Sequence, residues 1–364
     1  MAAAEQGPDA VKEEEQVVNP WEVSAGKGGI DYDKLVDQFG CQRLDAALVD
    51  RVARLTGRPP HVFLHRGLFF AHRDFSDILD LYEKGEKFYL YRGRGPSSEA
   101  LHLGHLIPFM FTKYLQEAFK NLTVEESKRL ARENAKDIIA CGFDVERTFI
   151  FADFGYVGGA FYENMAKVAR CVTCNKAVGT FGFSPEDHIG KYSFPPVQAV
   201  PSFPSSFPHL FAGKDQLRCL IPCAIDQDPY FRMTRDVAPR IHYQKPSLIE
   251  SRFFPALQVN KYVFSGGQDS VELHRKLGAN LDVDVPIKYL NFFLEDDDEL
   301  EHIKKLLYTR STRKEGWMLT GEVKQRLIAI LSELVARHQR ARAQVTNEMV
   351  DAFMAVRPLP KMFS

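Results

Sequence analysis

The sequence predicts an α/β fold, with a parallel-sheet domain followed by an all-helical domain. Two segments, 87–119 and 217–236, each read as a short strand, a turn and a helix. Parallel strands need helical connections of this kind, because both strands must run in the same direction. Residues 259–364 instead carry apolar side chains at helical spacing. A chain of 364 residues is long enough for two domains of ordinary size.

The N-terminal part is predicted to contain a tail and a small appended region. Residues 1–16 are polar and acidic, with few apolar side chains, which predicts a disordered tail. The appended region is 17–66. Its apolar start, 17–23, either lies across a pocket or forms a terminal strand on the main domain. Helices are expected over 31–39 and 44–56, where apolar residues repeat at helical spacing and glycines stand at the ends.

The stretch 91–105 joins a predicted strand to a predicted helix, and it holds most of the candidate chemistry. Its glycine-rich turn offers backbone N–H groups and a helix N-terminus, which together favour an anion such as phosphate. Its glycines let a second backbone or a flat base come close, because they lack a Cβ. These are Gly93, Gly95 and Gly104. His102 and His105 add two donors on one side of the first helical turn.

Taken alone, two histidines at this spacing are ordinary surface or core residues. The strand before them and the helix after them supply the context that a phosphate site requires.

A second strand, turn and helix follow at 217–236. The run 217–222 reads as a buried strand, 224–227 as the turn, and Asp228-Pro229 as the start of a helix with a cap and a proline in its first turn. Ligands of α/β proteins bind beyond the carboxyl ends of the strands. Asp226 and Gln227 can therefore face a crevice, whereas Asp228 is expected to serve only as the helix cap.

The remaining elements of the first domain follow from apolar spacing. Helices are expected over 74–83, 124–140 and 161–169, and a strand over 148–153. The segment 181–208 is rich in Phe and Pro and is expected to be a folded but irregular wall around a pocket. Gln198 is its conspicuous polar residue, and the alternative is that its amide only satisfies the loop backbone.

Composition narrows the class of protein. The net charge of −1 argues against a protein that coats nucleic acid by bulk charge, although a local basic patch can still serve. The sequence has no apolar run of about 18 residues, no secretory signal and an acidic start, so we expect a cytoplasmic protein that does not cross a membrane.

Among six cysteines, Cys171 and Cys174, with Cys219 and Cys223, have metal-ligand spacing. Buried reduced thiols are the stronger interpretation, and no metal site is predicted.

The string G-R-G-P-S-S-E-A-L-H-L-G-H-L-I-P-F at 93–109 contains the His-x-Gly-His signature of class I aminoacyl-tRNA synthetases. As a whole it resembles the tryptophanyl-tRNA synthetases of eukaryotic and archaeal type. Four further stretches agree, and the resemblance runs from about residue 20 to 353. They are 135–143, 193–203, 220–236 and 291–298.

This resemblance implies a Rossmann-like catalytic domain over 67–258, a helical anticodon-binding domain over 259–364 and a homodimer. The partners would be tryptophan, ATP with Mg²⁺, and tRNA(Trp). The resemblance assigns His102 and His105, with Arg94, to the catalytic phosphate contacts. The ATP-binding residues would be Gly93, Arg94, Gly95, His102, Gly104, His105 and Ala224.

Tryptophan would be held by Tyr91, Gln198, Asp226 and Gln227. An acceptor for the indole N–H rejects side chains without that group, because the acceptor would be left unpaired. Tyr91 is our choice for it; otherwise it is an ordinary strand aromatic. Gln268 and Asp269 resemble the anticodon-reading turn of the family, although their spacing alone would indicate a helix cap.

Two segments of the family are absent. At 120/121 the family has a strand and a polar loop that carry a Gln and an acidic residue of the amino-acid pocket. At 258/259 it has the Lys-Met-Ser loop that clamps the triphosphate, and the similar letters at 361–364 stand in the wrong context. The segments are either deleted or encoded and missing from the sequence as read. We favour the second, because deleting a central strand should disrupt the sheet.

Two other functions were weighed. A tyrosyl-tRNA synthetase shares the fold, but the string I-D-Q-D-P-Y-F at 225–231 argues against it. A non-catalytic interaction protein on a synthetase scaffold is supported only by the missing triphosphate loop.

In the helical part, 295–299 is expected to start a helix. Six basic residues are expected to form an RNA-facing strip or only scattered charge: Arg310, Arg313, Lys314, Arg337, Arg340 and Arg342.

Overall fold

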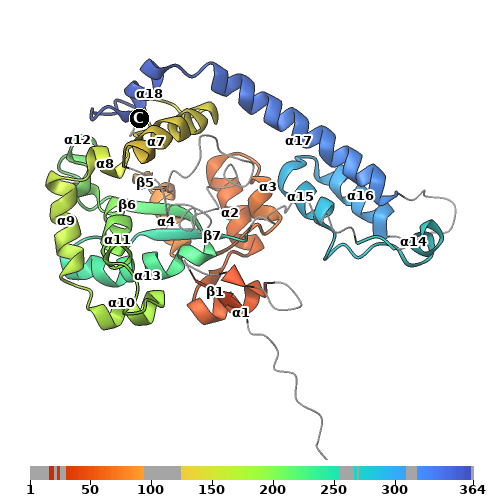
Figure 1. The fold of residues 1–364 in the computed structure, drawn as a ribbon, viewed down its shortest axis with the longest axis horizontal. Coiled ribbons are helices and arrows are strands. Elements are labelled where there is room, and N and C mark those ends of the chain that lie inside the picture. The colour runs from red at the N-terminus through yellow and green to blue at the C-terminus, as the bar shows by residue number, and fades with distance from the viewer. Residues whose placement is uncertain are drawn as a thin grey trace, which may run out of the picture.

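A computed structural model describes residues 16–19, 23–24, 30–93, 124–253, 266–268, 270–308 and 318–361. At its centre is a five-stranded sheet of order β3-β4-β7-β6-β5, covered by helices, with a further group of helices at one side (Figure 1). The strands are β3 (Gln42–Arg43), β4 (Phe69–Arg73), β5 (Phe88–Leu90), β6 (Arg218–Ala224) and β7 (Ser247–Ser251).

The sheet is mixed, with a parallel half and an antiparallel half. β5 pairs parallel to β6, with Leu90 opposite Leu220, and β6 pairs parallel to β7. β4 runs antiparallel to β7, and β3 antiparallel to β4. The expected strands 87–91 and 217–222 are thus confirmed, and they belong to the parallel half. As a result the carboxyl ends of β5, β6 and β7 lie at one edge of the sheet.

The main core lies between the sheet and the helices that follow residue 150. Phe161, Phe181, Phe203 and Phe207 are buried in it together with side chains of β6. The segment 181–208 is folded, as expected, but much of it is regular, because it contains the helix α11 (Ile189–Ala199), and its role as the wall of a pocket stays a prediction. Two prolines inside that helix had suggested an irregular backbone. Two 3₁₀ turns continue it, η2 (Val200–Ser202) and η3 (Pro204–Ser206).

The N-terminal region forms a small layer beside β3 and β4. β1 (Val17–Val18) and β2 (Val23–Ser24) pair antiparallel, and Val18 packs with Leu35 and Phe70. Val18 thus packs on the main domain, as the terminal-strand interpretation expects, but 17–18 and 23–24 are two short strands paired with each other, and 20–22 lie outside the described residues. The two expected helices are α1 (Tyr32–Phe39) and α2 (Ala46–Thr56), capped by the side chains of Asp31 and Asp45. The expected tail lies almost wholly outside the described residues.

The other expected helices of the first domain are confirmed as α4 (Phe75–Glu83), α7 (Val124–Ala140) and α9 (Gly159–Ala169). Shorter helices complete it. They are α3 (Val62–His65), α8 (Asp153–Tyr156), α10 (Cys174–Phe181), α12 (Pro208–Phe211) and α13 (Asp228–Val237), with the 3₁₀ turns η4 (Ile225–Gln227) and η5 (Ala238–Ile241).

The expected strand at 148–153 is wrong. These residues pair with no strand in the described part of the chain, and Ile150 N donates to Phe353 O at 3.0 Å. Phe149 and Phe151 pack instead on the aromatic core beside Phe207. A strand needs a neighbour with free backbone groups, and this run lies against the C-terminal segment.

Among the described residues the five strands pair without a further strand between them, and β5 stands at one end of the order. A strand beyond β5 would therefore be an edge addition.

The described part of 266–361 contains helices and no strand, as expected. Its helices are α14 (Val271–Leu277), α15 (Val285–Phe293), α16 (Asp297–Tyr308), α17 (Thr320–Ala343) and α18 (Asn347–Met354). Leu290, Leu300, Ile303 and Leu307 form a separate core with Val323 and Leu327 of α17. The acidic run starts α16, where Asp296 Oδ1 accepts from Glu299 N at 2.9 Å.

The 24 residues of α17 lead from this helical core back to the first domain (Figure 1). There α18 packs on α7, with Val350 and Phe353 buried against Ala135 and Ile139. No helix in the described part of the chain is both long and apolar enough to cross a membrane.

Candidate active site

The candidate site lies at the edge of the sheet where the three parallel strands end. Tyr91 directly follows β5, and its backbone N–H donates to Leu220 O of β6 at 3.1 Å. Ala224 is the last residue of β6, and it is followed at once by the η4 turn with Asp226 and Gln227. The parallel register thus brings two stretches more than 130 positions apart to one place, as the strand–turn–helix pattern predicted.

A chain of side-chain hydrogen bonds connects the predicted tryptophan-binding residues. Gln198 Nε2, from α11, donates to Gln227 Oε1 at 3.0 Å, and Gln227 Nε2 donates to Asp226 Oδ2 at 2.7 Å. The Tyr91 hydroxyl donates to Gln198 O at 3.4 Å. Asp226 and Gln227 are only 5% and 6% exposed. All four residues are therefore in one hydrogen-bonded group.

A buried acceptor of this group, the side-chain oxygen of Gln198, is suited to a ligand that donates a hydrogen bond. Gln198 Oε1 is buried and has no hydrogen-bond partner among the described residues. A buried acceptor without a donor is unfavourable, so a bound donor at this point would stabilise it. The loop-satisfying alternative for Gln198 is wrong, because its amide N–H₂ bonds to Gln227 and not to backbone.

Tyr91 is a neutral phenol at one end of this hydrogen-bonded group. Burial raises the pKa of Tyr91, and the nearby charge of Asp153 raises it further. The Tyr91 hydroxyl donates its hydrogen bond to Gln198 O, so a lone pair on the Tyr91 oxygen can accept a hydrogen bond from another group. Phe231 contacts its ring edge-on, with 6.3 Å between ring centroids.

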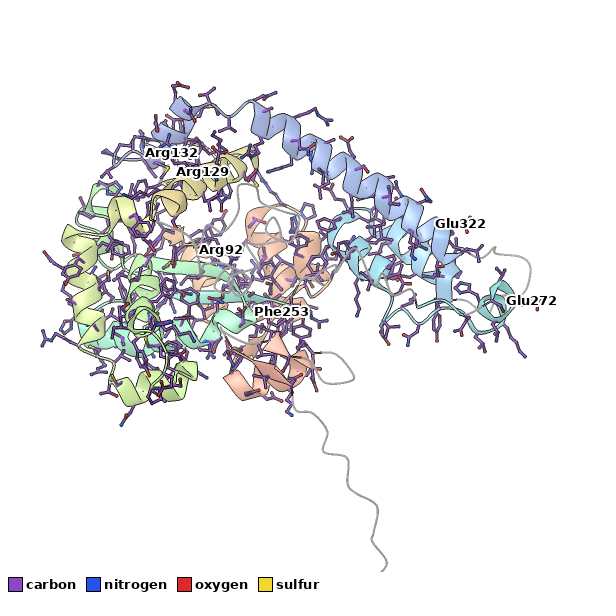
Figure 2. The ribbon with its side chains drawn as sticks, in the orientation of Figure 1. Arg92, Arg129, Arg132, Phe253, Glu272 and Glu322 are labelled. Atoms are coloured by element: carbon purple, nitrogen blue, oxygen red, sulfur yellow. The ribbon has the colours of Figure 1, made fainter. Side chains whose placement is uncertain are left out.

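The two residues that follow Tyr91, Arg92 and Gly93, are both placed close to the candidate site. A Cβ on Gly93 would lie 3.0 Å from the Tyr91 hydroxyl, so a side chain at 93 would press on the phenol. Arg92 was not foreseen as a site residue. Its Nη1 donates to Pro222 O at 2.7 Å, and burial lowers its pKa to about 10. Figure 2 shows Arg92 beside the sheet, two residues before the described part of the chain is interrupted at 94.

The predicted phosphate contacts cannot be placed. Outside the described residues lie Arg94, Gly95, His102, Gly104 and His105.

Of the predicted anticodon pair, Asp269 also lies outside the described residues, whereas Gln268 is described. Its Nε2 donates to Gly278 O at 2.9 Å, and it lines an open hollow of about 390 Å³ together with residues 277–282 and Tyr308.

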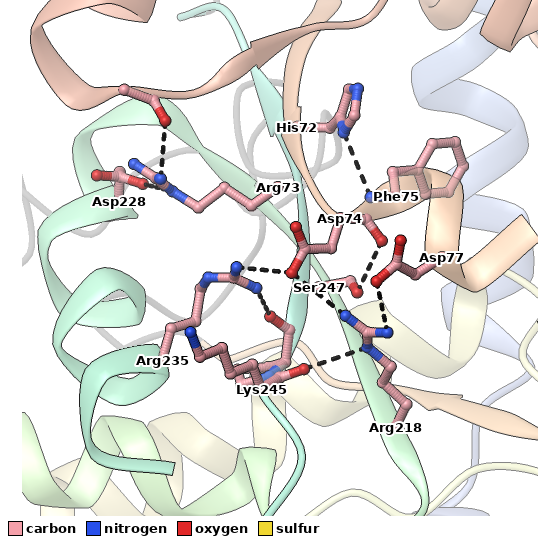
Figure 3. Close-up of polar contacts among 12 residues, drawn as sticks. His72, Arg73, Asp74, Phe75, Asp77, Arg218, Asp228, Arg235, Lys245 and Ser247 are labelled. Carbon is pink, nitrogen blue, oxygen red and sulfur yellow. Dashed lines mark hydrogen bonds and ion pairs between the residues drawn. The ribbon is translucent and has the colours of Figure 1, made fainter. Parts of the chain in front are cut away.

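Asp228 corrects one prediction. It was expected to cap α13, but its backbone is already helical, with φ −51° and ψ −43°, and it is completely buried. Its Oδ1 accepts from Arg73 Nε at 2.7 Å (Figure 3). A helix cap needs an extended backbone and a side chain folded over the first turn. Here an arginine from β4 holds that side chain instead.

The cysteine pairs are not arranged as a zinc site among the described residues. Cys219 and Cys223 are buried thiols in the main core, and Cys174 is the exposed first residue of α10. In the described part of the chain, Cys41, Asp228 and Glu250 form the one group with three potential metal-ligating side chains. Sequence reasoning overlooked it, because its members come from three distant stretches.

The expected basic strip is only partly free to face a partner. Arg342 Nη2 donates to Glu133 Oε2 at 2.9 Å, and Arg342 Nε lies 2.7 Å from Asp137 Oδ1, so Arg342 holds α17 to α7. Arg340 pairs with Glu333 on its own helix. Arg337 is exposed. The other three members of the strip lie outside the described residues.

A parallel sheet with polar turns at its strand ends, followed by a helical domain, is the architecture that the resemblance implied for a class I aminoacyl-tRNA synthetase. Solved structures agree. The tryptophanyl-tRNA synthetase of Plasmodium falciparum is 39% identical with a TM-score of 0.82, covering 92% of this chain and 97% of that one. The Encephalitozoon cuniculi enzyme bound to tryptophan is 38% identical with a TM-score of 0.75, covering 90% of this chain and 100% of that one.

The cytoplasmic tryptophan–tRNA ligase of Arabidopsis thaliana is 70% identical over 393 residues, covering 96% of each chain. The chain belongs to the family of cytoplasmic tryptophan–tRNA ligases. The alignment is longer than the 364 residues of this chain, so the relative contains residues that have no counterpart here. This agrees with the absent segments. No protein-family model matches the chain.

Proposed function

We propose that this chain activates tryptophan with ATP and transfers it to tRNA(Trp). The observation that supports this most is the hydrogen-bonded group of Tyr91, Gln198, Asp226 and Gln227, in which the buried Gln198 Oε1 can accept from a ligand. The E. cuniculi relative binds tryptophan.

Recognition of tryptophan would use one acceptor at each end of the molecule. Gln198 Oε1 would accept from the α-ammonium group, with the Asp226 carboxylate nearby to favour its charge. The Tyr91 oxygen would accept from the indole N–H. A phenylalanine side chain lacks that donor and would leave the Tyr91 oxygen unpaired.

The chemistry is proposed as two steps. A carboxylate oxygen of tryptophan attacks the α-phosphorus of ATP, a new O–P bond forms, and the bond to pyrophosphate breaks. Arg94, His102 and His105 would stabilise the charge that builds on the phosphate oxygens. A ribose hydroxyl of tRNA then attacks the acyl carbon, AMP leaves, and the hydroxyl proton is released.

Three further parts of the proposal come from the resemblance. Mg²⁺ would enter with ATP, would offset the negative charge of its phosphates and would need few protein ligands. Gln268, beside its hollow, would contact the anticodon. The functional unit would be a homodimer, and the domain limits would be 67–258 and 259–364.

The test is tryptophan-dependent exchange of pyrophosphate into ATP. We expect exchange with the full chain and a loss of roughly 10²-fold or more in His102→Ala, because a fixed donor to the developing charge is removed. His302→Ala, at an exposed position on α16, is the control and should leave the rate unchanged. No exchange with the full chain would overturn the proposal, and an unchanged rate in His102→Ala would overturn that role.

A second function is favoured by one observation. The chain lacks the Lys-Met-Ser loop, and the Arabidopsis relative contains residues without counterpart here. A protein without the triphosphate clamp would bind tryptophan yet form no adenylate, and would act as a non-catalytic binding protein. Sequencing the transcript across 120/121 and 258/259 separates the two, because encoded segments favour the enzyme.

A further inference from the structure

Four side chains from separate elements meet directly behind the tryptophan-binding turn. Cys41 follows α1, Arg73 ends β4, Asp228 begins α13 and Glu250 lies on β7. The Cys41 sulfur, an Asp228 oxygen and a Glu250 oxygen all lie within 4.8 Å of one another. Asp228 and Glu250 are completely buried. Asp228 is the next residue after Gln227, so anything that moves it moves the turn.

The positive charge in this cluster is the Arg73 guanidinium, and all three of its nitrogens already donate hydrogen bonds. Arg73 Nε donates to Asp228 Oδ1 at 2.7 Å, and its two other nitrogens donate to Gly40 O and Phe39 O at the end of α1. Arg73 therefore ties the N-terminal region to the start of α13. The Cys41 thiol is a weak donor and lies 3.8 Å from the same Asp228 oxygen.

Among the described residues no cation is hydrogen-bonded to the remaining carboxylate oxygens. Both oxygens of Glu250, and Asp228 Oδ2, have no hydrogen bond among the described residues. The nearest additional cation, Arg232, has its Nε 4.0 Å from Asp228 Oδ2. Two buried carboxylates beside one engaged guanidinium leave a negative charge that is very costly to bury. One proton removes that charge and converts a carboxylate into a hydrogen-bond donor.

We propose that Asp228 and Glu250 share one proton, and that this protonated pair positions the Asp226–Gln227 turn to bind tryptophan. Glu250 donates its carboxylic O–H to the Asp228 carboxylate. Arg73 holds the other side of Asp228, so the start of α13 is fixed from two directions. Both acids are positioning residues that do not touch the substrate. The binding part of this inference rests on the proposed function.

The groups that face the pair agree with this protonation. Burial, followed by the charge of Asp228, raises the pKa of Glu250 to about 8, while Arg73 lowers it by less. Burial also raises the pKa of the thiols of Cys41 and of Cys223 on β6, so both stay neutral. Above about pH 8 the proton leaves, and the two carboxylates repel each other. Asp228 and the adjoining Gln227 then shift.

A divalent cation is the competing occupant, because thiol and carboxylate groups are metal ligands. Arg73 weighs against it. Its guanidinium occupies Asp228 Oδ1 and would stand beside the cation with the same sign of charge. The test therefore includes the metal content.

The variant Glu250→Gln keeps the size of the side chain and carries an amide donor at every pH. Tryptophan binding is measured by isothermal titration calorimetry from pH 7 to pH 9. At pH 7 the Kd should agree within about 2-fold. At pH 9 the parent should lose about 10-fold more affinity, because only about a tenth of its sites keep the proton if the pKa is about 8. The tryptophan ammonium titrates identically for both proteins.

Equal pH dependence in parent and variant, or weaker binding by the variant at pH 7, would overturn the positioning role. The control Glu86→Gln changes an exposed side chain and should follow the parent. The infrared C=O band of a protonated acid provides a readout that does not need tryptophan. It should be present in the parent at pH 7 and absent in Glu250→Gln.

Absence of that band, or a stoichiometric metal ion in native mass spectrometry that the variant loses, would overturn the shared proton. If the band is present but the chain binds no tryptophan at any pH, the shared proton stands, while the positioning role and the proposed function both fail.

Stability gives an independent check of the same proton. The folded pKa of Glu250 is raised above the ordinary value of about 4.3, so between about pH 4 and pH 8 the folded chain binds more protons than the unfolded chain. This contribution is fully present below about pH 4 and is lost as the pH rises to about 8. Glu250→Gln should remove it, so its melting temperature should exceed that of the parent most at pH 8 to 9. A parent advantage there would contradict the shared proton.

Discussion

Tyr89 and Tyr91 point to the same face of β5, two positions apart, and both donate to backbone carbonyls of the wall formed by α11 and η2. Tyr89 donates to Pro201 O at 3.1 Å and is only 6% exposed. Tyr91 donates to Gln198 O at 3.4 Å and is half-buried. The same type of residue therefore serves the core in one case and faces the site in the other.

This pair allows a matched test of the indole acceptor. Tyr91→Phe should raise the KM for tryptophan about 2- to 10-fold, which corresponds to one neutral hydrogen bond of about 0.5–1.5 kcal/mol. Tyr89→Phe should leave the KM unchanged and lower the free energy of unfolding by about 1 kcal/mol, because it removes a buried hydrogen bond. Pyrophosphate exchange and urea unfolding provide the two readouts. If both variants shift the KM alike, Tyr91 has no special role.

The residues of the candidate site differ in how far sequence alone could place them. Tyr91, Asp226 and Gln227 were predictable because each lies within three residues of the end of a parallel strand, and such ends meet at one edge. Asp228 was not, since its partner Arg73 lies 155 positions away and local spacing favours a cap. Glu250 reads as one more residue of a buried strand, and only its packing against Asp228 reveals its chemistry.

At the scale of elements, helices could be predicted better than strands. The limits of α1, α4 and α7 came out within about two residues, because caps and apolar spacing act locally. The run 148–153 has strand-like composition, but pairing depends on a neighbour that local sequence does not reveal. In α11 the prolines obscured a helix that is stabilised by burial against the core.

The end of α7 provides an element-scale test. Gly142, just beyond it, has φ +93°, a conformation that other residues adopt at a cost of about 1–2 kcal/mol. Gly142→Ala should lower the free energy of unfolding by about that amount. Gly179→Ala, inside α10 with open space around its Cα, is the control. It should be neutral or stabilising by up to about 1 kcal/mol. Equal effects of the two substitutions in urea unfolding would show that the backbone at Gly142 is not strained.

At the scale of the whole molecule, α17 is held to the first domain by a buried charge network. Asp137 of α7 is 1% exposed, and its Oδ1 lies 3.0 Å from His338 Nε2 and 2.7 Å from Arg342 Nε. At the opposite side, Asp297 Oδ1 of α16 accepts from Arg66 Nε at 2.7 Å. The helical domain is therefore attached at two separated places.

Asp137→Asn should weaken the first attachment. It removes the charge that two basic side chains of α17 share, and we expect a loss of about 1.5–3 kcal/mol in the free energy of unfolding. Glu333→Gln, in an exposed pair on the same helix, should cost less than about 1 kcal/mol. Both values come from urea unfolding. A loss for Asp137→Asn no larger than that for Glu333→Gln would mean that the network does not hold the domains.

The packing of α18 on α7 has a consequence for biosynthesis. Ala135 and Ile139 are synthesised early, yet Val350 and Phe353, which cover them, leave the ribosome some two hundred codons later. Vectorial folding of the first domain is thus interrupted, and the nascent chain carries an apolar surface that a chaperone can recognise until Val350 and Phe353 have been synthesised.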